Sequence, residues 1–150
     1  MTILINRTEY LDAFIRLNEA WITRYFSIEE ADRILASNPA KIIEDRGYIF
    51  ILLVENEVVG TCALFKDDGD AFQLARMAVA PAHQSNGYGD KLIKAAIDQL
   101  HEIKASRVYL LSNTILTSAI SLYKKHGFTI VCEGQHPVYA RCDIVMEKKL

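Results

Sequence analysis

Two glycines stand directly in front of the most regular helical pattern in the sequence. Gln84, Gly87 and Gly89 occur in the stretch "VAPAHQSNGYGDKLIKAAIDQL", whose second half repeats apolar residues at helical spacing. The N-terminus of a helix presents unpaired N–H groups and a partial positive charge, and glycines let an anion approach these groups closely. The residue types and their spacing therefore predict a phosphate-binding turn, with a purely structural tight turn as the alternative.

Two common phosphate-binding signatures do not fit this turn. The dinucleotide fingerprint requires a third glycine, and Leu92 stands in its place. The P-loop requires a lysine followed by serine or threonine, which the turn lacks. The glycine pair alone leaves both the anion site and the tight turn open.

The composition predicts one folded domain over residues 1–150, because 51% of the residues are hydrophobic and the net charge is only −2. The lysines and arginines are scattered and form no basic stripe, so nucleic acid is not expected as a partner. Cys62, Cys132 and Cys142 lack C-x-x-C spacing and are interpreted as reduced core thiols. The histidines lack metal-ligand spacing, so no metal is expected. No apolar run reaches the length of a signal peptide or a membrane span, which predicts a soluble, cytoplasmic protein with no membrane partner.

Strand and helix patterns alternate along the chain, and the elements that they predict must position the glycine turn at 84–89. The first half predicts a strand at 2–6, a helix from Thr8 whose apolar stripe is broken only by Asn18, and a helix opened by a capping box of Ser27 and Glu30. A short helix is expected at 38–47. Strands are predicted at 48–54, 58–65, 71–79, 107–112, 128–133 and 141–150, and helices after Gly89 and at 117–127. In 71–79, strict alternation places Phe72, Leu74, Arg76 and Ala78 on one face. The order is typical of an α/β fold with a mixed sheet flanked by helices.

Two segments together resemble a known family. The stretch "QLARMAVAPAHQSNGYG" resembles the coenzyme A segment of the GNAT family of N-acetyltransferases, whose Q/R-x-x-G-x-G/A pattern begins here at Gln84. The stretch "LLSNTILTSAISLYKKHGF" resembles the second family signature, in which Asn113 precedes a helix that ends in Tyr123 and then Gly127 and Phe128. The segments follow the family's order, and the expected element order is similar over nearly the whole chain.

The resemblance implies a single-domain acyl-CoA N-acyltransferase fold with a mixed, mostly antiparallel sheet, and acetyl-CoA as the cosubstrate. In this family the strand before the glycine turn splays from its neighbour, pantetheine lies in the wedge, and the pyrophosphate rests on backbone amides of the turn. Tyr123 is the implied catalytic residue, which donates a proton to the departing CoA thiolate. The implied cofactor-binding residues are Met77, Ala78, Val79, Gln84, Ser85, Asn86, Gly87, Tyr88, Gly89, Asp90 and Asn113.

The turn departs from the family pattern at three positions. Ser85 and Asn86 stand where many relatives carry glycine and a cationic residue, so a positive charge near the phosphates is missing. Asp90 adds a negative charge to the first helical turn, which favours the helix dipole but lies close to the predicted phosphate site. The sequence does not decide which of these two effects of Asp90 is larger.

The general base is a further departure. Gln73 stands where many relatives have a glutamate, and an amide cannot take a proton from the amine. Glu29 and Glu30 are other candidates, because the first two helices usually border the acceptor site. The favoured interpretation of both is structural, with Glu30 completing the capping box and Glu29 complementing the helix dipole. Water is a third route for the proton.

Four other side chains have a structural interpretation as well. Tyr123 lies on an apolar helix where a core tyrosine is ordinary, and only the motif around it favours catalysis. Asn113 also fits a turn at the strand end. Arg141 and Asp143 are expected to form a surface ion pair, with an acidic acceptor as the alternative partner of Arg141.

The predicted function is transfer of the acetyl group of acetyl-CoA to a primary amine by direct attack in a ternary complex. One alternative is a catalytically weak acyl-CoA-binding sensor on the same fold, which Gln73 favours. Another is an unrelated phosphate-binding α/β protein that prefers nucleotides. The acceptor stays open between a small molecule and a peptide amine, with "AWITRYFSIEE" and "EGQHPVYARC" as candidate borders of its site. A homodimer through the C-terminal strands is a further expectation.

Overall fold

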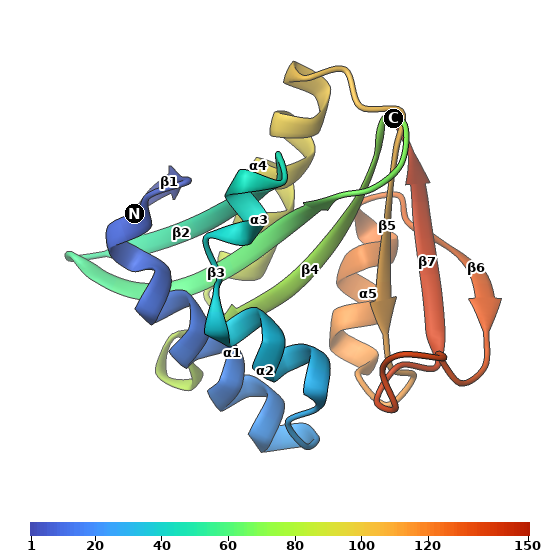
Figure 1. Ribbon diagram of the computed structural model, residues 1–150, viewed down its shortest axis with the longest axis horizontal. Helices are drawn as coiled ribbons and strands as arrows, with labels where there is room; N and C mark the ends of the chain where they lie inside the picture. Colours follow the sequence, from blue (N-terminus) through green and yellow to red (C-terminus); the bar gives the residue numbers. More distant parts are fainter.

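The computed structural model describes residues 1–150, and a single sheet of seven strands organises them (Figure 1). The strands lie in the order β1-β2-β3-β4-β5-β7-β6, and only the β4–β5 pair is parallel. Their bounds are β1 Thr2–Ile5, β2 Tyr48–Val54, β3 Glu57–Lys66, β4 Ala71–Val79, β5 Arg107–Ser112, β6 Thr129–Glu133 and β7 Ile144–Lys149. The predicted mixed, mostly antiparallel sheet is therefore confirmed.

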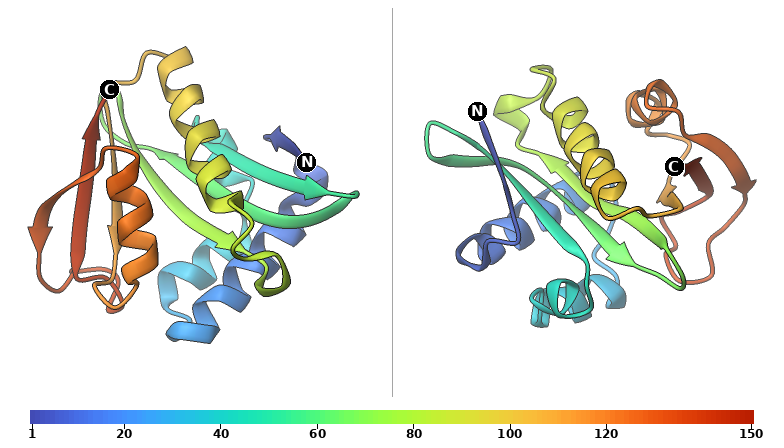
Figure 2. Two further views of the ribbon diagram at one scale, coloured as in Figure 1. Left: turned by 180° about the vertical axis from the view of Figure 1, so that it is seen from behind. Right: turned by 90° about the horizontal axis from the view of Figure 1, so that it is seen from above.

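The helices cover both faces of the sheet (Figure 2). On one face lie α1 Leu11–Tyr25, α2 Glu30–Ser37 and the short α3 Lys41–Glu44, and on the other lie α4 Tyr88–Glu102 and α5 Thr117–Lys125. Short 3₁₀ turns, Thr8–Tyr10 and Pro81–His83, precede α1 and follow β4. None of the helices has the length and apolarity needed to cross a bilayer.

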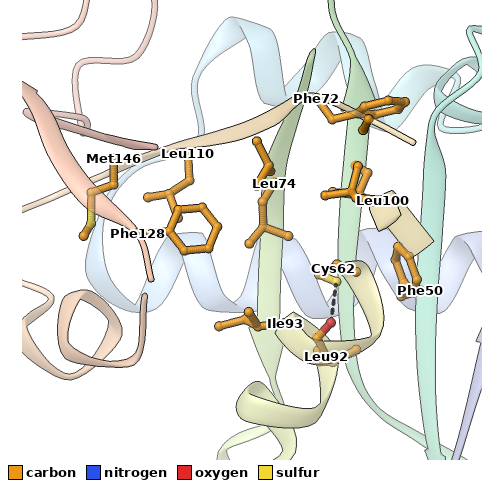
Figure 3. Close-up of a cluster of buried hydrophobic side chains, with 14 of the residues drawn as sticks. Phe50, Cys62, Phe72, Leu74, Leu92, Ile93, Leu100, Leu110, Phe128 and Met146 are labelled. Carbon is orange, nitrogen blue, oxygen red and sulfur yellow. Dashed lines mark hydrogen bonds between the residues drawn. The ribbon is translucent and has the colours of Figure 1, made fainter. Parts of the chain in front are cut away.

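The larger core lies between the sheet and α4 (Figure 3). Leu92, Ile93 and Leu100 of α4 are buried against Phe50, Leu74 and other apolar residues of the central strands. A smaller cluster around Phe14, Ile49 and Ile51 fills the space under α1. The apolar stripe expected for α4 is buried at Leu92, Ile93, Ala96 and Leu100, so α4 and the turn in front of it have a fixed position on the sheet, whereas Ile103 lies beyond the helix and is exposed.

The strict alternation expected in β4 fails at Arg76. The register between β3 and β4 shifts opposite Cys62, and Arg76 has a positive φ of 57°, which together mark a β-bulge. Phe72 and Leu74 face the α4 side, and after the bulge Met77 and Val79 pack on that same core. Arg76 is thereby turned to the α1 and α2 side of the sheet, instead of sharing the face of Phe72 as the sequence predicted.

The start of α2 also differs from its prediction. The residue that caps α2 is Glu29, whose backbone N–H donates to Asp32 Oδ2 at 2.8 Å, so the capping box expected from Ser27 and Glu30 is wrong. Glu30 instead forms an exposed ion pair with Arg33 at 3.1 Å. The helix begins later because the backbone is still extended at Glu29. Asp32, the third residue of this helix, is buried.

The three cysteines are all free thiols, but they lie in different environments. Cys62 and Cys142 are buried, as expected, and burial raises the pKa of the Cys142 thiol to about 11. Cys132 is exposed, because β6 is the last strand of the sheet and every one of its residues is exposed. The expectation of three core thiols is therefore wrong for Cys132.

Candidate active site

The two central parallel strands separate along their length. β4 and β5 pair only through Ala71–Arg107, Phe72–Val108 and Gln73–Tyr109, and beyond these pairs they diverge (Figure 1). The edge of β4 that faces β5 is therefore unpaired from Leu74 to Val79. An unpaired strand edge presents backbone N–H and C=O groups to an extended ligand.

The turn after β4 presents a row of free backbone donors. The N–H groups from Ser85 to Asp90 have no acceptor in the chain, and the first helical bond of α4 runs from Lys91 N–H to Gly87 O at 3.1 Å. Gly87 has a φ of +77°, a conformation that suits glycine, and no atom lies within 4 Å of the place where a Cβ would stand. The combination of free N–H groups, open space and the positive end of the helix dipole forms a cradle for an anion.

Two polar side chains of the turn are used inside it. Gln84 Nε2 donates to Val79 O at 3.2 Å, and Asn86 Nδ2 donates to His83 O at 3.1 Å. The Gln84 N–H is also occupied, because it donates to Pro81 O at 3.4 Å. These side chains therefore hold the backbone of the turn in place, while the free donors come from the main chain.

The charge of Asp90 is compensated by the end of α5. Asp90 Oδ1 accepts from Lys125 Nζ at 2.9 Å and lies 2.8 Å from His126 Nε2. The hydrogen bond from Lys125, followed by that from His126, lowers the pKa of the Asp90 carboxyl. A Cβ at Gly89 would lie 3.3 Å from Leu122 Cδ2, so the start of α4 sits closely against α5. These contacts fix the turn relative to the helix that carries Tyr123.

A pocket with a cavity volume of about 100 Å³, open to solvent, lies where the two strands diverge. It is lined by β4, the end of β5, α1, α5 and the segment before β7, and 13 of its 19 lining residues are hydrophobic. Of the predicted site residues, the pocket brings together Met77, Asn113 and Tyr123, with Gln73 beside them. Ala78, Val79 and the turn residues lie outside its lining, along the strand edge and the anion cradle.

The Tyr123 hydroxyl lines this pocket and forms no hydrogen bond within the chain. The Tyr123 ring packs edge to face on Phe128, with ring centroids 6.0 Å apart. Burial, with a smaller contribution from the nearby Cys62 thiol, raises the pKa of Tyr123 to about 12, and no hydrogen bond contributes to that shift. The phenol is therefore protonated at neutral pH and free to donate to a bound group.

Asn113 is engaged with its own chain. Its Nδ2 donates to Arg141 O at 2.7 Å, and its Oδ1 accepts from Ile115 N–H at 3.0 Å. This is the turn role that the sequence also allowed for it, and it ties the end of β5 to the segment before β7. One N–H of its amide is left for another acceptor.

A buried group of charged and polar side chains, Asn18, Asp32, Arg76, Tyr139 and Arg141, closes one end of the pocket and is called the arginine cluster below. Arg141 Nη1 and Nη2 lie 2.6 and 2.7 Å from the two carboxylate oxygens of Asp32. Arg76 bonds the same carboxylate, Asn18 Oδ1 at 3.1 Å and the Tyr139 hydroxyl at 2.8 Å. Both guanidinium groups also lie over the Tyr139 ring.

The arginine cluster shows that the ion pair expected between Arg141 and Asp143 does not form. Two of its members, Asn18 and Arg76, were unusual for their positions in the sequence. The surface pair of Arg141 with Asp143 is wrong, because Asp143 instead accepts from the backbone N–H and hydroxyl of Thr114, both at 2.8 Å. The polar Asn18 in the apolar stripe of α1 and the charged Arg76 in the mostly apolar strand β4 belong to one network. Each is a polar residue among apolar ones, but nothing in the sequence indicated that the two side chains contact each other.

Asp32 is ionised despite its burial. Burial by itself would raise the pKa of its carboxyl, but hydrogen bonds from Arg141, from the Glu29 N–H and from Arg76 outweigh this and lower its pKa to about 2. The side chain of Asp32 is 1% exposed, and that of Arg76 is 6% exposed. Both guanidinium groups therefore share one buried negative charge.

No carboxylate lines the pocket. Glu29, a candidate base in the sequence, uses its two carboxylate oxygens to accept from Ala140 N–H at 2.8 Å and from Arg141 at 3.2 Å. No group of three or more His, Cys, Asp or Glu side chains is arranged to hold a metal ion. Gln73, which lines the pocket where many relatives have a glutamate, is neutral.

The contacts of Glu29 lead to a prediction about the base. We expect Glu29→Gln to lower the free energy of unfolding by about 1–2 kcal/mol, because the variant weakens the charged contact to Arg141. The pH dependence of the rate should be unchanged, since Glu29 does not face the pocket. Thermal melting and a pH–rate profile measure the two effects, with the exposed Glu30→Gln as the matched control. A flattened pH–rate profile in Glu29→Gln would show that it is the base after all.

The chain matches the family model described as "Acetyltransferase (GNAT) family" over residues 10–128. It is 30% identical over 107 residues to the [ribosomal protein bS18]-alanine N-acetyltransferase of Haemophilus ducreyi, a match that covers 70% of this chain and 74% of that protein. A further curated relative, from Bacillus subtilis, is matched over 66% of its own length.

Solved structures share the fold over the whole chain. The GNAT-family acetyltransferase of Staphylococcus aureus has a TM-score of 0.85 at 19% identity, with 99% of both chains covered. The PaiA N-acetyltransferase of Thermoplasma acidophilum, solved in complex with coenzyme A, has a TM-score of 0.74 at 20% identity, with 100% of both chains covered. The match to the family model confirms the resemblance of the two sequence motifs, and the chain belongs to the GNAT family of acetyltransferases.

Proposed function

We propose that residues 1–150 form one N-acetyltransferase domain that transfers the acetyl group of acetyl-CoA to a primary amine in a ternary complex. The observation that carries this proposal is the continuity of three features: the free N–H groups of Ser85–Asp90, the unpaired edge of β4, and the pocket that holds Tyr123. Membership of the GNAT family and a relative solved with coenzyme A support acetyl-CoA as the cosubstrate.

Acetyl-CoA has a chemistry that fits each feature in turn. Its pyrophosphate is an anion for the backbone N–H groups of the turn, and its pantetheine arm carries amides that can pair with the β4 edge at Met77, Ala78 and Val79. The thioester then lies in the pocket near Tyr123, with the remaining N–H of Asn113 as a second donor. The amine nitrogen attacks the acetyl carbon, the carbon–sulfur bond breaks, and the thiolate leaves.

The proton of the amine has no carboxylate to receive it in this pocket. We infer that the amine reacts as its free base and that water carries the proton to solvent, with Gln73 orienting that water by hydrogen bonds. This route predicts a rate that rises with pH as the amine loses its proton. The Haemophilus ducreyi relative is named as an N-acetyltransferase of ribosomal-protein alanine, which supports an amine acceptor for this chain.

A catalytically weak acyl-CoA sensor on the same fold is the second candidate, and Gln73 in place of a carboxylate favours it. The decisive experiment is release of free thiol from acetyl-CoA with a panel of amines that includes amino acids, aromatic amines and polyamines. Thiol release that depends on an amine supports the enzyme. Saturable binding of acetyl-CoA without release by any amine would support the sensor.

A substitution at the turn tests the anion cradle. We expect Gly87→Val to weaken acetyl-CoA binding about ten- to a hundredfold, because its side chain would occupy the open space in front of the free N–H groups and strain a backbone with φ of +77°. Isothermal titration with acetyl-CoA measures the affinity, and circular dichroism checks the fold.

Gly69 provides the matched control for this substitution. It also has a positive φ, of +64°, and open space where a Cβ would stand, but it lies in the turn between β3 and β4, at the far end of β4. Gly69→Val should therefore reproduce the backbone strain without a loss of affinity. Equal affinities of a folded Gly87→Val protein and the wild type would rule out the cradle.

A further inference from the structure

The arginine cluster gives the pocket a positive wall. Arg76 and Arg141 line the pocket, whereas no aspartate, glutamate, lysine or histidine does. The carboxylates that pair with these arginines, Asp32 and Glu29, are not part of the lining and stand behind it. A molecule in the pocket therefore meets the guanidinium groups and not the carboxylates, although Asp32 and Glu29 together balance the two positive charges.

Both arginines keep unused donors. Arg76 engages Asn18, Asp32 and Tyr139 through its two terminal nitrogens, and Arg141 engages Glu29 and Asp32 through its own. The Nε–H of each guanidinium has no acceptor in the chain. Arginine donors that are held rigidly by other bonds suit the planar geometry of a carboxylate.

The wall next to the arginines is apolar. Trp21, Ile22 and Phe26 from α1 and its end, with Phe65 from β3, line the same pocket. Trp21 and Phe26 also contact each other, with ring centroids 6.1 Å apart. An aromatic surface of this kind accommodates an apolar side chain with a large gain from burial.

We propose that the acceptor is a free α-amino acid with an apolar side chain. This inference rests on the proposed function and concerns only which amine reacts. The carboxylate of the acceptor accepts hydrogen bonds from Arg76 and Arg141, its side chain packs on Trp21 and Phe26, and its amino group faces the thioester. The nitrogen forms a bond to the acetyl carbon, the thiolate leaves with the electron pair of the broken bond, and one proton passes to water, giving an N-acetylamino acid and CoA.

The same wall disfavours two other classes of amine. A polyamine would bring a second ammonium group towards two guanidinium groups, with no carboxylate in the lining to receive it. A peptide N-terminus carries a neutral carbonyl in place of the carboxylate and would form weaker hydrogen bonds with the arginines. The carboxylate is therefore the feature that distinguishes the proposed acceptor.

The test measures the activity of the wild-type enzyme towards four acceptors, so its result does not depend on any substitution. They are L-phenylalanine, L-phenylalaninamide, phenethylamine and spermidine, each assayed by thiol release and by mass of the product. We expect kcat/KM for phenylalanine to exceed that of the amide and of phenethylamine by about ten- to a hundredfold at equal concentrations of free-base amine. Spermidine should be the poorest of the four.

The outcomes separate this inference from the proposed function. Phenethylamine or spermidine reacting as well as phenylalanine would overturn the carboxylate site while leaving the acetyltransferase intact. An equal rate with phenylalaninamide would overturn it in favour of a peptide-type acceptor. No reaction with any of the four, nor with the wider amine panel, would overturn the proposed function itself.

A conservative variant adds a residue-level readout. Arg141→Lys keeps a positive charge next to Asp32 but loses the Nε–H that is free for the acceptor, together with the paired bonds of Nη1 and Nη2 to Asp32. We expect it to raise KM for phenylalanine more than it changes kcat and to reduce the preference for phenylalanine over phenethylamine about tenfold. A preference that survives unchanged in a folded Arg141→Lys protein would remove Arg141 from the acceptor site.

Discussion

Replacing Tyr123 with phenylalanine is expected to lower kcat about 100-fold while leaving the affinity for acetyl-CoA nearly unchanged. Direct attack of the amine leaves negative charge on sulfur, and a donor aimed at that sulfur stabilises the transition state. The Tyr123 hydroxyl lines the pocket and has no partner in the chain, so it is available to donate to that sulfur. The phenylalanine ring would fill the same space, so contacts with the cofactor would remain.

The raised pKa of Tyr123 defines how it acts. A phenol with a pKa of about 12 is a weaker acid than an alkyl thiol with a pKa of about 8.5, so complete proton transfer to the thiolate is unfavourable. We therefore expect Tyr123 to donate a hydrogen bond to the developing thiolate rather than to give up its proton. Loss of one such donor typically costs about 10²–10³-fold in rate.

Steady-state and single-turnover kinetics measure this effect, with Tyr109→Phe as the control. Tyr109 donates to Asp67 at 2.6 Å outside the pocket, so its substitution should leave kcat unchanged. The Tyr123→Phe variant should also melt near the wild-type temperature, since its hydroxyl has no bond to lose. If Tyr123→Phe kept more than about half of the wild-type kcat with chemistry rate-limiting, Tyr123 would be a core residue only.

The second large effect is expected at Asp32. Asp32→Asn should lower the free energy of unfolding by about 3 kcal/mol at pH 7, because two nearly buried guanidinium groups would lose their shared negative charge. For a chain of this length the melting temperature should fall by roughly 6–12 °C. Chemical and thermal denaturation measure both quantities. Asp98→Asn, which breaks the exposed Lys94–Asp98 pair, is the control and should change stability far less.

The pH dependence of stability provides an independent check on Asp32. Its pKa in the folded protein is about 2, below the ordinary value of 3.8, so its carboxylate stabilises the fold above about pH 4. This contribution is lost as the pH falls from about 4 through about 2. The stability difference between the wild type and Asp32→Asn should therefore narrow over that range. A difference that stays constant from about pH 7 to about pH 2 would contradict the ion-paired state of Asp32.

Most of the sheet could be predicted because its signals are local. The apolar run of β2, the alternation in β5 and the stripe of α4 each follow from a few consecutive residues, and β2 and β5 begin and end where expected. The glycine turn could be predicted for the same reason, since its donors belong to one short segment of backbone. The bulge at Arg76 could not be predicted, because strict alternation makes no allowance for an inserted residue.

The acceptor end of the pocket could not be predicted for a different physical reason. Asp32 and Arg141 are 109 residues apart in the chain, and Arg76 and Asn18 are 58 apart, so their pairing depends on the packed fold. Local reasoning placed Glu30 in a capping box and paired Arg141 with its neighbour Asp143. Both predictions paired residues that are close in the sequence. Neither identified Asp32, whose buried carboxylate is brought to the arginines by tertiary packing.

The anion cradle of the turn has a consequence for how its sequence can vary. Its donors are main-chain N–H groups, which every residue except proline supplies, so selection acts on the path of the backbone more than on the side chains attached to it. Ser85 and Asn86 can then replace the glycine and the cation of other family members without dismantling the cradle. Gly87 has less freedom, because a side chain there would fill the open space in front of the N–H groups. Its positive φ is not the whole reason, since Ser85 adopts a φ of 66° in the same turn. The chain is only 19% identical to the Staphylococcus aureus acetyltransferase and still shares its fold, so the backbone path persists while most side chains differ.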